Sequence, residues 1–498
     1  MAWVHFGWRR VGAYIALVLV LILGLYMALT QPETAELDQL ASLQGQYRVE
    51  ILRDSWGVPH VFGQTDADTA FGIAYAHAED DFKTIQGILA AARGELAMFL
   101  GPEGAGNDFM VGLLRHRRKL HLRYNKDLSP ETRALAQGYA DGLNYYASQH
   151  QDQAWAALYP VRGQDVVAGF VHKVPLFYGF EKTLAKLFEA NKRPQLKEAN
   201  GKPQKSLKQD STRQSTPKPP AKSSTEDTSA HDNNRGFATG VNLESILALG
   251  SDNHLAAGLR QSSLFGAEAS NTLAVSPRRS SVGQTFLDIN SHQPWKGPVS
   301  WYELHAHSEE GWDMVGGLFP GSPIILHGHN RHLGWAHTVN KSDLYDVYTL
   351  KLHPDKPLQY KYNGSWRTMQ ERTIKIKVKI WGPLYWTAER KVYWSAYGPT
   401  VKLDHGTYAF RYASMNDIRQ LEQWYRMNKA RNFREWQKAM RLRAIPCFNV
   451  GYGDQKGNIY YLYNARIPKR SPKYNWQGYV PGDTSDTLWH EYIPFDKQ

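Results

Sequence analysis

The chain has 498 residues, of which 42% are hydrophobic and 12% aromatic. This length exceeds one compact domain, and the composition excludes a disordered or fibrous protein. The net charge of +12 raises nucleic acid as a partner, but nine Lys/Arg against four Asp/Glu lie within residues 191–230. Because no basic stripe alternates with stacking aromatic residues, the charge predicts a solvated linker and surface and no nucleic-acid partner. Cys447 is the only cysteine, which excludes an intrachain disulfide and a cysteine-based metal site.

The amino terminus, residues 1–30, predicts a signal peptide or a membrane anchor. Arg9 and Arg10 precede an apolar run from Val11 to Leu29, after which the sequence turns polar. A positive flank followed by an apolar helix is typical of an export signal whose basic end stays in the cytoplasm. No small-x-small cleavage site follows, which favours an uncleaved anchor over a removed signal. We therefore expect a periplasmic protein, anchored to the inner membrane or secreted.

Residues 45–190 predict a mixed region of strand and helix. Residues 47–53 alternate apolar and polar side chains as a strand does. Residues 66–100 carry an apolar stripe at helical spacing, which predicts one long helix. A second helix is expected over residues 131–147, after the start signal Ser129-Pro130.

Residues 191–269 are expected to be a linker or a removable spacer. Between residues 191 and 236 there is no aromatic residue, no valine and no isoleucine, while Lys, Ser, Thr, Pro and Gln dominate. Such a segment buries too little apolar surface to offset its ordering entropy. Residues 237–269 regain some apolar character, and from Ser270 to Gln498 the chain is rich in strand patterns.

Ser270 begins a pattern that predicts a hairpin. Residues 270–275 form a short apolar strand, residues 276–283 have turn chemistry, and residues 284–290 form a second strand. If the hairpin is centred near Ser281, Ser270 lies opposite His292. A hydroxyl and an imidazole at this spacing can also simply satisfy each other, so the spacing alone does not establish a catalytic pair.

An ordered series of short motifs resembles the penicillin acylase family of N-terminal-nucleophile hydrolases, and it extends over nearly all of the chain after the anchor. The resemblance is closest to the acyl-homoserine-lactone, aculeacin and cephalosporin acylase branch. The matching blocks, in chain order, are residues 49–60 (VEILRDSWGVPH), 68–81, 93–97 (RGELA), 139–144 (YADGLN), 270–275 (SNTLAV), 319–323 (FPGSP), 328–335 (GHNRHLGW), 457–459 (GNI) and 467–470 (IPKR).

The resemblance implies an α+β fold, a four-layer αββα sandwich with two sheets packed face to face between helices. It also implies a precursor that cuts itself before Ser270, so that residues 45–190 correspond to the first chain and residues 270–498 to the start of the catalytic chain. Ser270 would attack through its hydroxyl and use its own α-amine, with a pKa of about 7.7–8.0, as base. In that scheme His292 orients the amine and tunes it, and the backbone N–H of Val339 donates to the oxyanion.

Two departures from the family pattern bear on activity. Alanine stands at position 269, where the family usually has glycine. The family's second oxyanion donor is an asparagine beyond a Pro-Phe stretch, and here the chain ends shortly after Pro494 and Phe495. We therefore expect a fold that is incomplete at its C-terminus. The missing part is either lost or supplied by a separately encoded C-terminal chain.

Metal-binding patterns occur at two places. Asp343, Tyr345 and Asp346 have the spacing with which penicillin acylases hold calcium, and Glu181 would add a carboxylate from the first chain; two solvated loop aspartates are the equally weighted alternative. His305 and His307 would share a strand face, which raises a zinc hydrolase, but no carboxylate has the helical H-E-x-x-H spacing. The chemistry itself is expected to need no cofactor.

The sequence thus predicts an enzyme that hydrolyses a linear amide, with a small acyl amide as substrate. The start Ser-Asn-x-Leu-Ala-Val and His292 favour N-acyl-homoserine lactones or other fatty-acyl amides over penicillins. The alternative is a membrane-tethered, catalytically inactive remnant, or one half of a split acylase.

Overall fold

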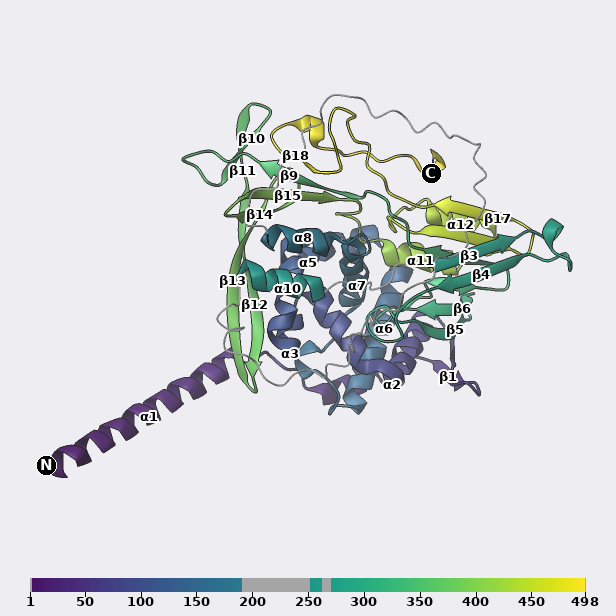
Figure 1. Ribbon diagram of the computed structural model, residues 1–498. Coiled ribbons are helices and arrows are strands. Elements are labelled where there is room, and N and C mark those ends of the chain that lie inside the picture. Colours follow the sequence, from purple (N-terminus) through teal and green to yellow (C-terminus); the bar gives the residue numbers. More distant parts are fainter. Residues whose placement is uncertain (1, 190–250, 262–269, 498) are drawn as a thin grey trace, which may run out of the picture.

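Figure 1 shows the computed structural model of the chain, which describes residues 2–189, 251–261 and 270–497. The α-helices are α1 (Ala2–Thr30), α2 (Asp66–Arg93), α3 (Leu96–Leu100), α4 (Ala105–Leu114), α5 (His116–Asp127), α6 (Pro130–Gln149), α7 (Gly163–Leu176), α8 (Phe180–Glu189), α10 (Asp252–Gln261), α11 (Gln420–Asn428) and α12 (Phe433–Met440). The strands are β1 (Val49–Arg53), β2 (Pro59–Gly63), β3 (Ser270–Val275), β4 (Phe286–Ser291), β5 (Tyr302–Ser308), β6 (Asp313–Leu318), β7 (His327–His329), β8 (Leu333–Thr338), β9 (Tyr345–Leu350), β10 (Gln359–Tyr362), β11 (Ser365–Thr368), β12 (Gln370–Trp381), β13 (Leu384–Trp394), β14 (Pro399–Leu403), β15 (Gly406–Tyr412), β16 (Asn449–Asp454), β17 (Ile459–Tyr463) and β18 (Tyr479–Pro481).

An eight-stranded sheet in the order β1-β2-β5-β6-β7-β8-β16-β17 organises the molecule. It combines strands from both sides of the linker, and β2 pairs with β5 in parallel. One face packs on α2, where Val61, Ile73 and Met314 are fully buried in the largest core cluster. The other face carries the β3–β4 hairpin over β8 and β16. A cut before Ser270 would therefore leave two chains held together by a shared sheet.

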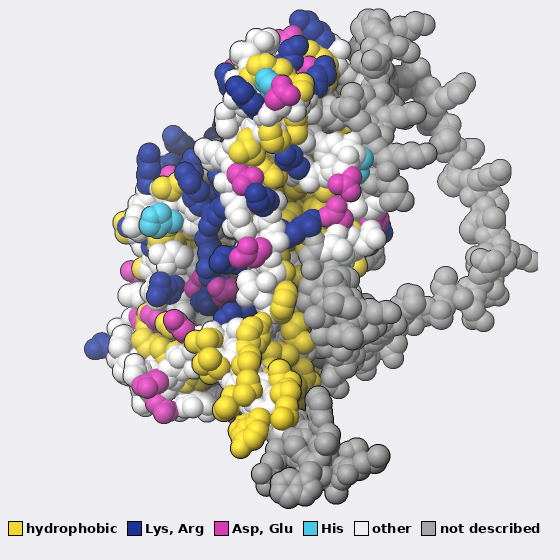
Figure 2. Space-filling view, turned by 90° about the vertical axis from the view of Figure 1, so that its left-hand side faces the viewer, with side chains coloured by type: hydrophobic (Ala, Val, Ile, Leu, Met, Phe, Trp, Pro, Cys, Tyr) yellow, Lys and Arg dark blue, Asp and Glu magenta, His cyan; other side chains and the backbone are white. Residues whose placement is uncertain are grey.

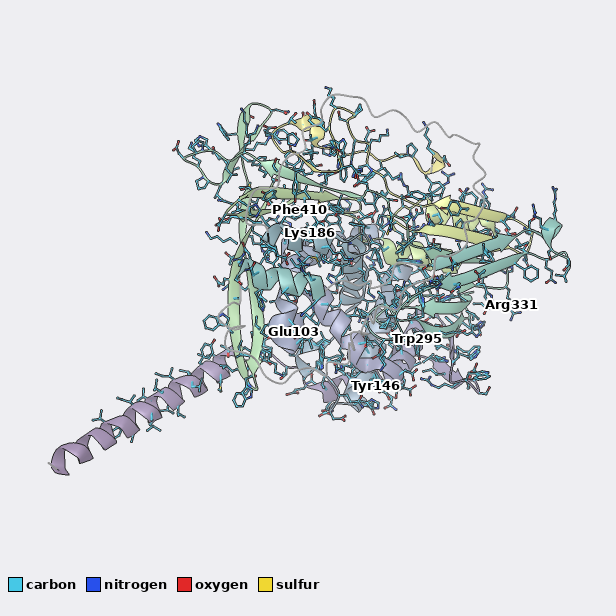
Figure 3. All side chains as sticks on the ribbon, viewed as in Figure 1. Glu103, Tyr146, Lys186, Trp295, Arg331 and Phe410 are labelled. Carbon is cyan, nitrogen blue, oxygen red and sulfur yellow. The ribbon has the colours of Figure 1, made fainter. Side chains whose placement is uncertain are left out.

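A second sheet of six strands, in the order β12-β13-β14-β15-β9-β18, encloses the helices on another side (Figure 1). Its apolar face packs on α4, α8 and α10. Phe180 of α8 meets Phe410 of β15 with ring centroids 5.3 Å apart. Phe410 is labelled in Figure 3. Alternating isoleucine and lysine along β12 explains this packing, because successive side chains of a strand point to opposite faces.

The fold is α+β, as the sequence predicts. The described residues provide a helix layer, a sheet and a two-stranded hairpin on the sheet's far face. The four-layer arrangement therefore stays an expectation.

Element boundaries follow local sequence signals. The strand at β1, the helix at α6 and the strand at β3 are confirmed; α6 begins where the Ser129 hydroxyl accepts from the backbone N–H of Thr132. The single helix expected over residues 66–100 is wrong. Gly94 adopts a left-handed conformation, with φ of +72°, and ends α2 before α3 begins.

Within the linker or removable spacer expected over residues 191–269, residues 252–261 form the helix α10. Leu255, Ala256 and Leu259 are fully buried between α4 and α8. A Cβ atom on Gly258 would lie 2.9 Å from the backbone nitrogen of Gly106 in α4, so the two helices cross at a pair of glycines. The remainder of the predicted spacer, residues 191–250 and 262–269, lies outside the described residues.

The apolar helix α1 projects from the body next to the turn that joins β12 and β13 (Figure 1). The window Ala13–Thr30 is apolar and long enough to cross a membrane, and none of it is buried. The hydroxyl of Tyr26 donates to the carbonyl of Tyr385 at 2.9 Å, and the amide of Gln31 donates to that of Pro383. Figure 2 shows this side of the molecule, with apolar side chains of α1 below a surface rich in Lys and Arg.

Candidate active site

Ser270 pairs with Ser291 across the β3–β4 hairpin. The pairing expected from the sequence, Ser270 with His292, is therefore wrong by one residue. A slip of one residue sends a side chain to the other face of a hairpin. His292 follows β4 on its exposed side, where its Nε2 lies 3.5 Å from Nδ2 of Asn271.

The structure brings Ser270 and Val339 together at one small cavity of about 30 Å3, beneath the hairpin. Val339 directly follows β8, the strand on which the hairpin packs. Aromatic and aliphatic side chains make most of the wall. The lining residues are Phe177, Ser270, Ser291, Gln293, Trp301, Phe319, Leu326, His337, Thr338, Val339, Trp424 and Phe448. Ser270 and Val339, predicted as nucleophile and oxyanion donor, thus face the same space.

Ser291 connects the hairpin to the sheet below it. Its hydroxyl donates to the carbonyl of His337 at 2.9 Å and lies 3.2 Å from Nδ1 of His327. Because a hydroxyl has one proton, Ser291 accepts from His327, whose Nδ1 carries the hydrogen. This network fixes the position of β4, and β4 holds β3 with Ser270 in register.

Two histidines beneath the hairpin are held neutral. Burial lowers the pKa of His327 to about 4 and that of His337 to about 3, and for His337 the nearby His327 adds to the effect. The indole N–H of Trp424 donates to Nε2 of His337 at 3.1 Å, so this nitrogen is unprotonated. Both imidazoles are therefore uncharged at neutral pH.

A second small cavity lies beside the first, next to α7. Phe177, Phe319, Leu326 and Trp424 also line this second cavity of about 20 Å3, which reaches Lys173. The amine of Lys173 donates to the carbonyl of Pro320 at 3.2 Å, and burial lowers its pKa to about 7. The two cavities thus share four apolar lining residues, and Lys173 lines the second cavity.

The residues predicted for calcium meet a guanidinium. Nε of Arg470 donates to Oδ2 of Asp346 at 2.9 Å, and Nη2 donates to Oδ1 and to the backbone carbonyl of Asp343, both at 3.1 Å. Asp346 also accepts from the indole of Trp489 at 2.6 Å, and burial raises its pKa to about 6. Glu181 is fully buried. Burial of Tyr345 raises the pKa of its phenol, and the nearby charge of Glu181 adds to this rise.

This donor set does not fit calcium as it is arranged, because Arg470 already bridges the two carboxylates. A calcium ion at this place would have to displace the guanidinium. The calcium site therefore stays a prediction, and the position of Arg470 argues against it.

Comparison of the sequence with known proteins identifies the family of this chain. The sequence model described as penicillin amidase matches residues 48–498. The chain belongs to the penicillin amidase family.

The related proteins of the penicillin amidase family are acylases. An acyl-homoserine lactone acylase PvdQ of Pseudomonas fluorescens is 27% identical over 445 residues, which are 86% of this chain and 51% of that protein. Aculeacin-A acylase of Actinoplanes utahensis is 25% identical over 448 residues, 85% of this chain and 51% of that protein. A solved penicillin G acylase of Alcaligenes faecalis aligns with a TM-score of 0.40 and 28% identity, over 45% of this chain and 40% of that chain. The chain spans about half the length of the curated relatives it matches.

Ser291, His327 and Trp424 belong to this candidate site, and sequence reasoning missed them. Ser291 stands one residue before the histidine that was chosen, so the correct hairpin register would have found it. Nothing in the local sequence links His327 to Ser291, because their contact depends on how the hairpin packs on the sheet. Nothing in the local sequence links Trp424 of α11 to residue 337, because their contact depends on how α11 packs beside the sheet.

Proposed function

We propose that the protein is an amidohydrolase that cleaves a linear acyl amide through an acyl-enzyme on Ser270. The observation that supports this most strongly is the shared cavity of Ser270 and Val339 beneath the hairpin. Ser270 is the first residue of β3, so a cut before it would present a hydroxyl and an α-amine on the same residue at the cavity.

The chemistry then follows from one residue and its surroundings. The α-amine of Ser270 takes the proton of its own hydroxyl, directly or through a water molecule, and the oxygen attacks the amide carbonyl. The oxyanion forms beside the backbone N–H of Val339, a type of donor whose loss typically costs roughly 100- to 1,000-fold in rate. The protonated amine gives its proton to the leaving amine. Water then hydrolyses the ester and releases the carboxylic acid.

Positioning in this scheme falls to Ser291 and His327 instead of His292. Ser291 lies directly opposite Ser270 and is held by the sheet below. The place of His292 on the exposed side, beside Asn271, gives it no support for the orienting role first expected.

The substrate is a small acyl amide with an apolar acyl group. The cavity of Ser270 and its neighbour at α7 share the walls Phe177, Phe319, Leu326 and Trp424, which suit a hydrocarbon chain. The relatives named as acyl-homoserine lactone acylases favour an N-acyl-homoserine lactone over penicillin. At about 30 Å3 the cavity holds about one water molecule, so these side chains must move apart to admit a chain.

A C-terminal continuation would complete the site, in the same polypeptide or in a separate one. Among the described strands, β3 and β4 pair only with each other. Leu273 and Phe286 on the outer face of the hairpin are 67% and 52% exposed. Unpaired strand edges and exposed apolar residues are what a further strand and its covering helices would bury. Such a continuation would also provide a second oxyanion donor.

We further propose that α1 anchors the enzyme to the inner membrane with the body in the periplasm. The tip of the β12–β13 hairpin lies at the last turn of α1 and exposes Trp381 and Trp386. Tryptophans at this level are typical of a membrane–water interface. Lys375 and Lys377 on the same hairpin suit anionic headgroups.

The test of the activity is a panel of N-acyl-homoserine lactones and penicillin G, offered to purified full-length protein and to Ser270→Ala. Release of homoserine lactone by the wild type and none by Ser270→Ala supports the proposal. Preference for penicillin G would overturn the substrate class alone. An uncut chain without activity on any amide would support the inactive remnant instead.

A further inference from the structure

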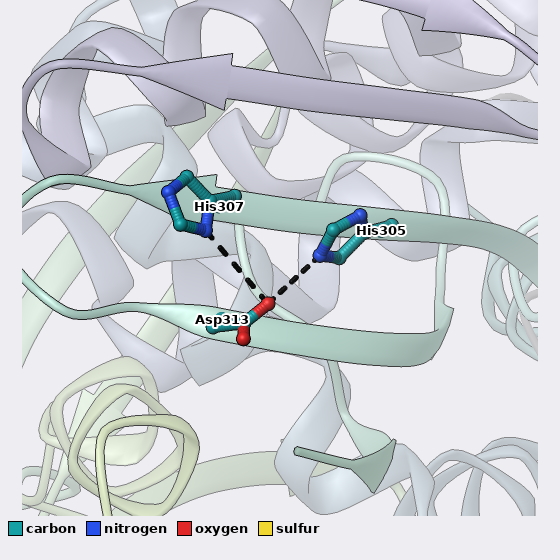
Figure 4. Close-up of side chains that lie close together, drawn as sticks. All are labelled: His305, His307 and Asp313. Carbon is teal, nitrogen blue, oxygen red and sulfur yellow. Dashed lines mark hydrogen bonds and ion pairs between the residues drawn. The ribbon is translucent and has the colours of Figure 1, made fainter. Parts of the chain in front are cut away.

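A second cluster of metal-binding side chains lies away from Ser270, on the face of the eight-stranded sheet opposite α2. His305 and His307 project from β5 and Asp313 from β6 (Figure 4). In the register of the two strands His307 lies directly across from Asp313. His305, two residues before His307, points to the same face. Within the described part of the chain, these three form the one such group of histidines and acids close enough to share an ion.

The geometry of this His305–His307–Asp313 cluster suits one small cation. Its three ligand atoms, Nε2 of His305, Nδ1 of His307 and a carboxylate oxygen of Asp313, lie within 4.8 Å of one another. Oδ1 of Asp313 is 2.9 Å from the first nitrogen and 3.8 Å from the second. An ion about 2.0–2.2 Å from each donor needs only small side-chain rotations.

Oδ1 of Asp313 faces nitrogen atoms from two imidazoles. A carboxylate oxygen can only accept, so the 2.9 Å distance to Nε2 of His305 requires a hydrogen on that nitrogen. A metal ion can take the place of this hydrogen.

Neighbouring side chains orient the ligands from behind. Nδ1 of His305 lies 3.2 Å from Nδ1 of His60 on the adjacent strand β2, with which it pairs in register. Nε2 of His60 lies 3.8 Å from a carboxylate oxygen of Asp54. When His305 donates from Nδ1 to His60, its Nε2 lone pair is left for a metal. Metal-binding histidines usually have such a partner on their second nitrogen.

We propose that His305, His307 and Asp313 bind a divalent transition-metal ion of the zinc type. Two imidazoles and one carboxylate favour zinc, cobalt or nickel over calcium and magnesium, which prefer oxygen ligands. The three side chains are 18–35% exposed, so an ion can enter and a fourth position stays open to solvent. Arg331 donates to the other oxygen of Asp313 at 3.0 Å and is itself 86% exposed, at the outer end of the sheet (Figure 3). It can therefore stay as an outer partner or move away.

This site is independent of the proposed amidase. None of its residues lines the cavity of Ser270. Failure of metal binding therefore leaves the proposed hydrolysis untouched, and failure of hydrolysis leaves the metal site untouched.

The test uses untagged full-length protein, freed of metal with a chelator and titrated with zinc chloride by calorimetry. Cobalt(II) is added in parallel, and its visible absorption reports the ligand set. One equivalent is expected to bind. His307→Ala and the isosteric Asp313→Asn should each weaken binding by more than about 10-fold, since loss of an outer-shell partner alone costs roughly 10- to 100-fold. His60→Ala should weaken zinc binding by roughly 10- to 100-fold, because it removes an outer partner of His305.

His332→Ala is the matched control, because His332 lies in the turn between β7 and β8 and contacts Gln455 instead of the cluster. It should bind zinc as the wild type does. Circular dichroism of each variant confirms the fold, and Asp313→Asn keeps the side-chain volume if an alanine variant fails to fold. Zinc affinity that is equal in wild type, His307→Ala and Asp313→Asn would overturn the proposal, as would a wild type that binds no equivalent below millimolar concentration.

Discussion

Replacing Arg470 by alanine tests whether its guanidinium, and not calcium, neutralises the carboxylates of Asp343 and Asp346. The side chain of Asp346 is fully buried and pairs with Arg470, which is 11% exposed. Breaking a buried pair by removing one partner typically costs about 3–5 kcal/mol. With about 2.1 cal/mol/K of unfolding entropy per residue and about 400 folded residues, this corresponds to a fall of about 4–6 °C in the unfolding midpoint of Arg470→Ala.

The loss of stability in Arg470→Ala should depend on pH. The folded-state pKa of Asp346 is about 6, above its ordinary value of 3.8, so its protonated form favours the folded state at low pH. This contribution is fully present below about pH 4 and is lost as the pH rises through 6. At pH 5 Asp346 is largely protonated with or without Arg470, so Arg470→Ala should cost little. At pH 8 it should cost the full amount.

The assay is thermal unfolding followed by tryptophan fluorescence at pH 5 and pH 8. Lys469→Ala is the matched control, because its partner Glu491 is exposed, and it should leave the midpoint unchanged at both values. The double variant Arg470→Ala/Asp346→Asn should recover most of the loss at pH 8. Equal losses at both pH values would refute the reasoning. Stabilisation of the wild type by added calcium would show that the ion displaces Arg470 and that the calcium prediction is right.

Three further substitutions test the site and the fold. Ser291→Ala removes the hydroxyl that connects His327 to the carbonyl of His337; turnover should fall by about tenfold or more, with a stability loss of only about 1–2 kcal/mol, measured by kinetics and by thermal unfolding. A wild-type rate would show that this contact does not position Ser270. His292→Ala should leave kcat/KM within about threefold, because His292 lies on the exposed side of the hairpin, and a loss of 100-fold would contradict the observed register. Gly258→Ala should lower the unfolding midpoint by several degrees, since its Cβ would meet α4 at 2.9 Å, whereas Gly87→Ala, with 4.0 Å of room, should be neutral or raise it. Equal midpoints for these two glycine variants would contradict the packing of α10.

Much of the fold follows from local sequence signals. Alternation predicts β1, a short apolar run predicts β3, and the Ser129-Pro130 start predicts α6, because these signals act within a few residues. The helix break at Gly94 was missed because the apolar stripe continues into α3 and conceals the turn. The helix α10 was missed for the opposite reason. It has few apolar residues, and its stability comes from α4 and α8, which are distant in sequence.

The candidate site was predicted in part. Ser270 and Val339 were named through the family resemblance, and the structure brings them to one cavity. The pairing of Ser270 with His292 failed because turn residues do not fix a hairpin register to one residue. Sequence spacing typical of a helix did not predict that Asp313 lies beside the two histidines of β5. Their proximity comes from cross-strand pairing of β5 with β6.

N-terminal sequencing of the protein isolated from cells tests the central claim most directly. The account predicts a chain that begins Ser-Asn-Thr-Leu-Ala, together with an amino-terminal fragment that remains bound through the shared sheet, and it predicts that Ser270→Ala yields neither. A single uncut chain that still hydrolyses acyl amides would contradict it, because Ser270 would then have no free α-amine to act as its base.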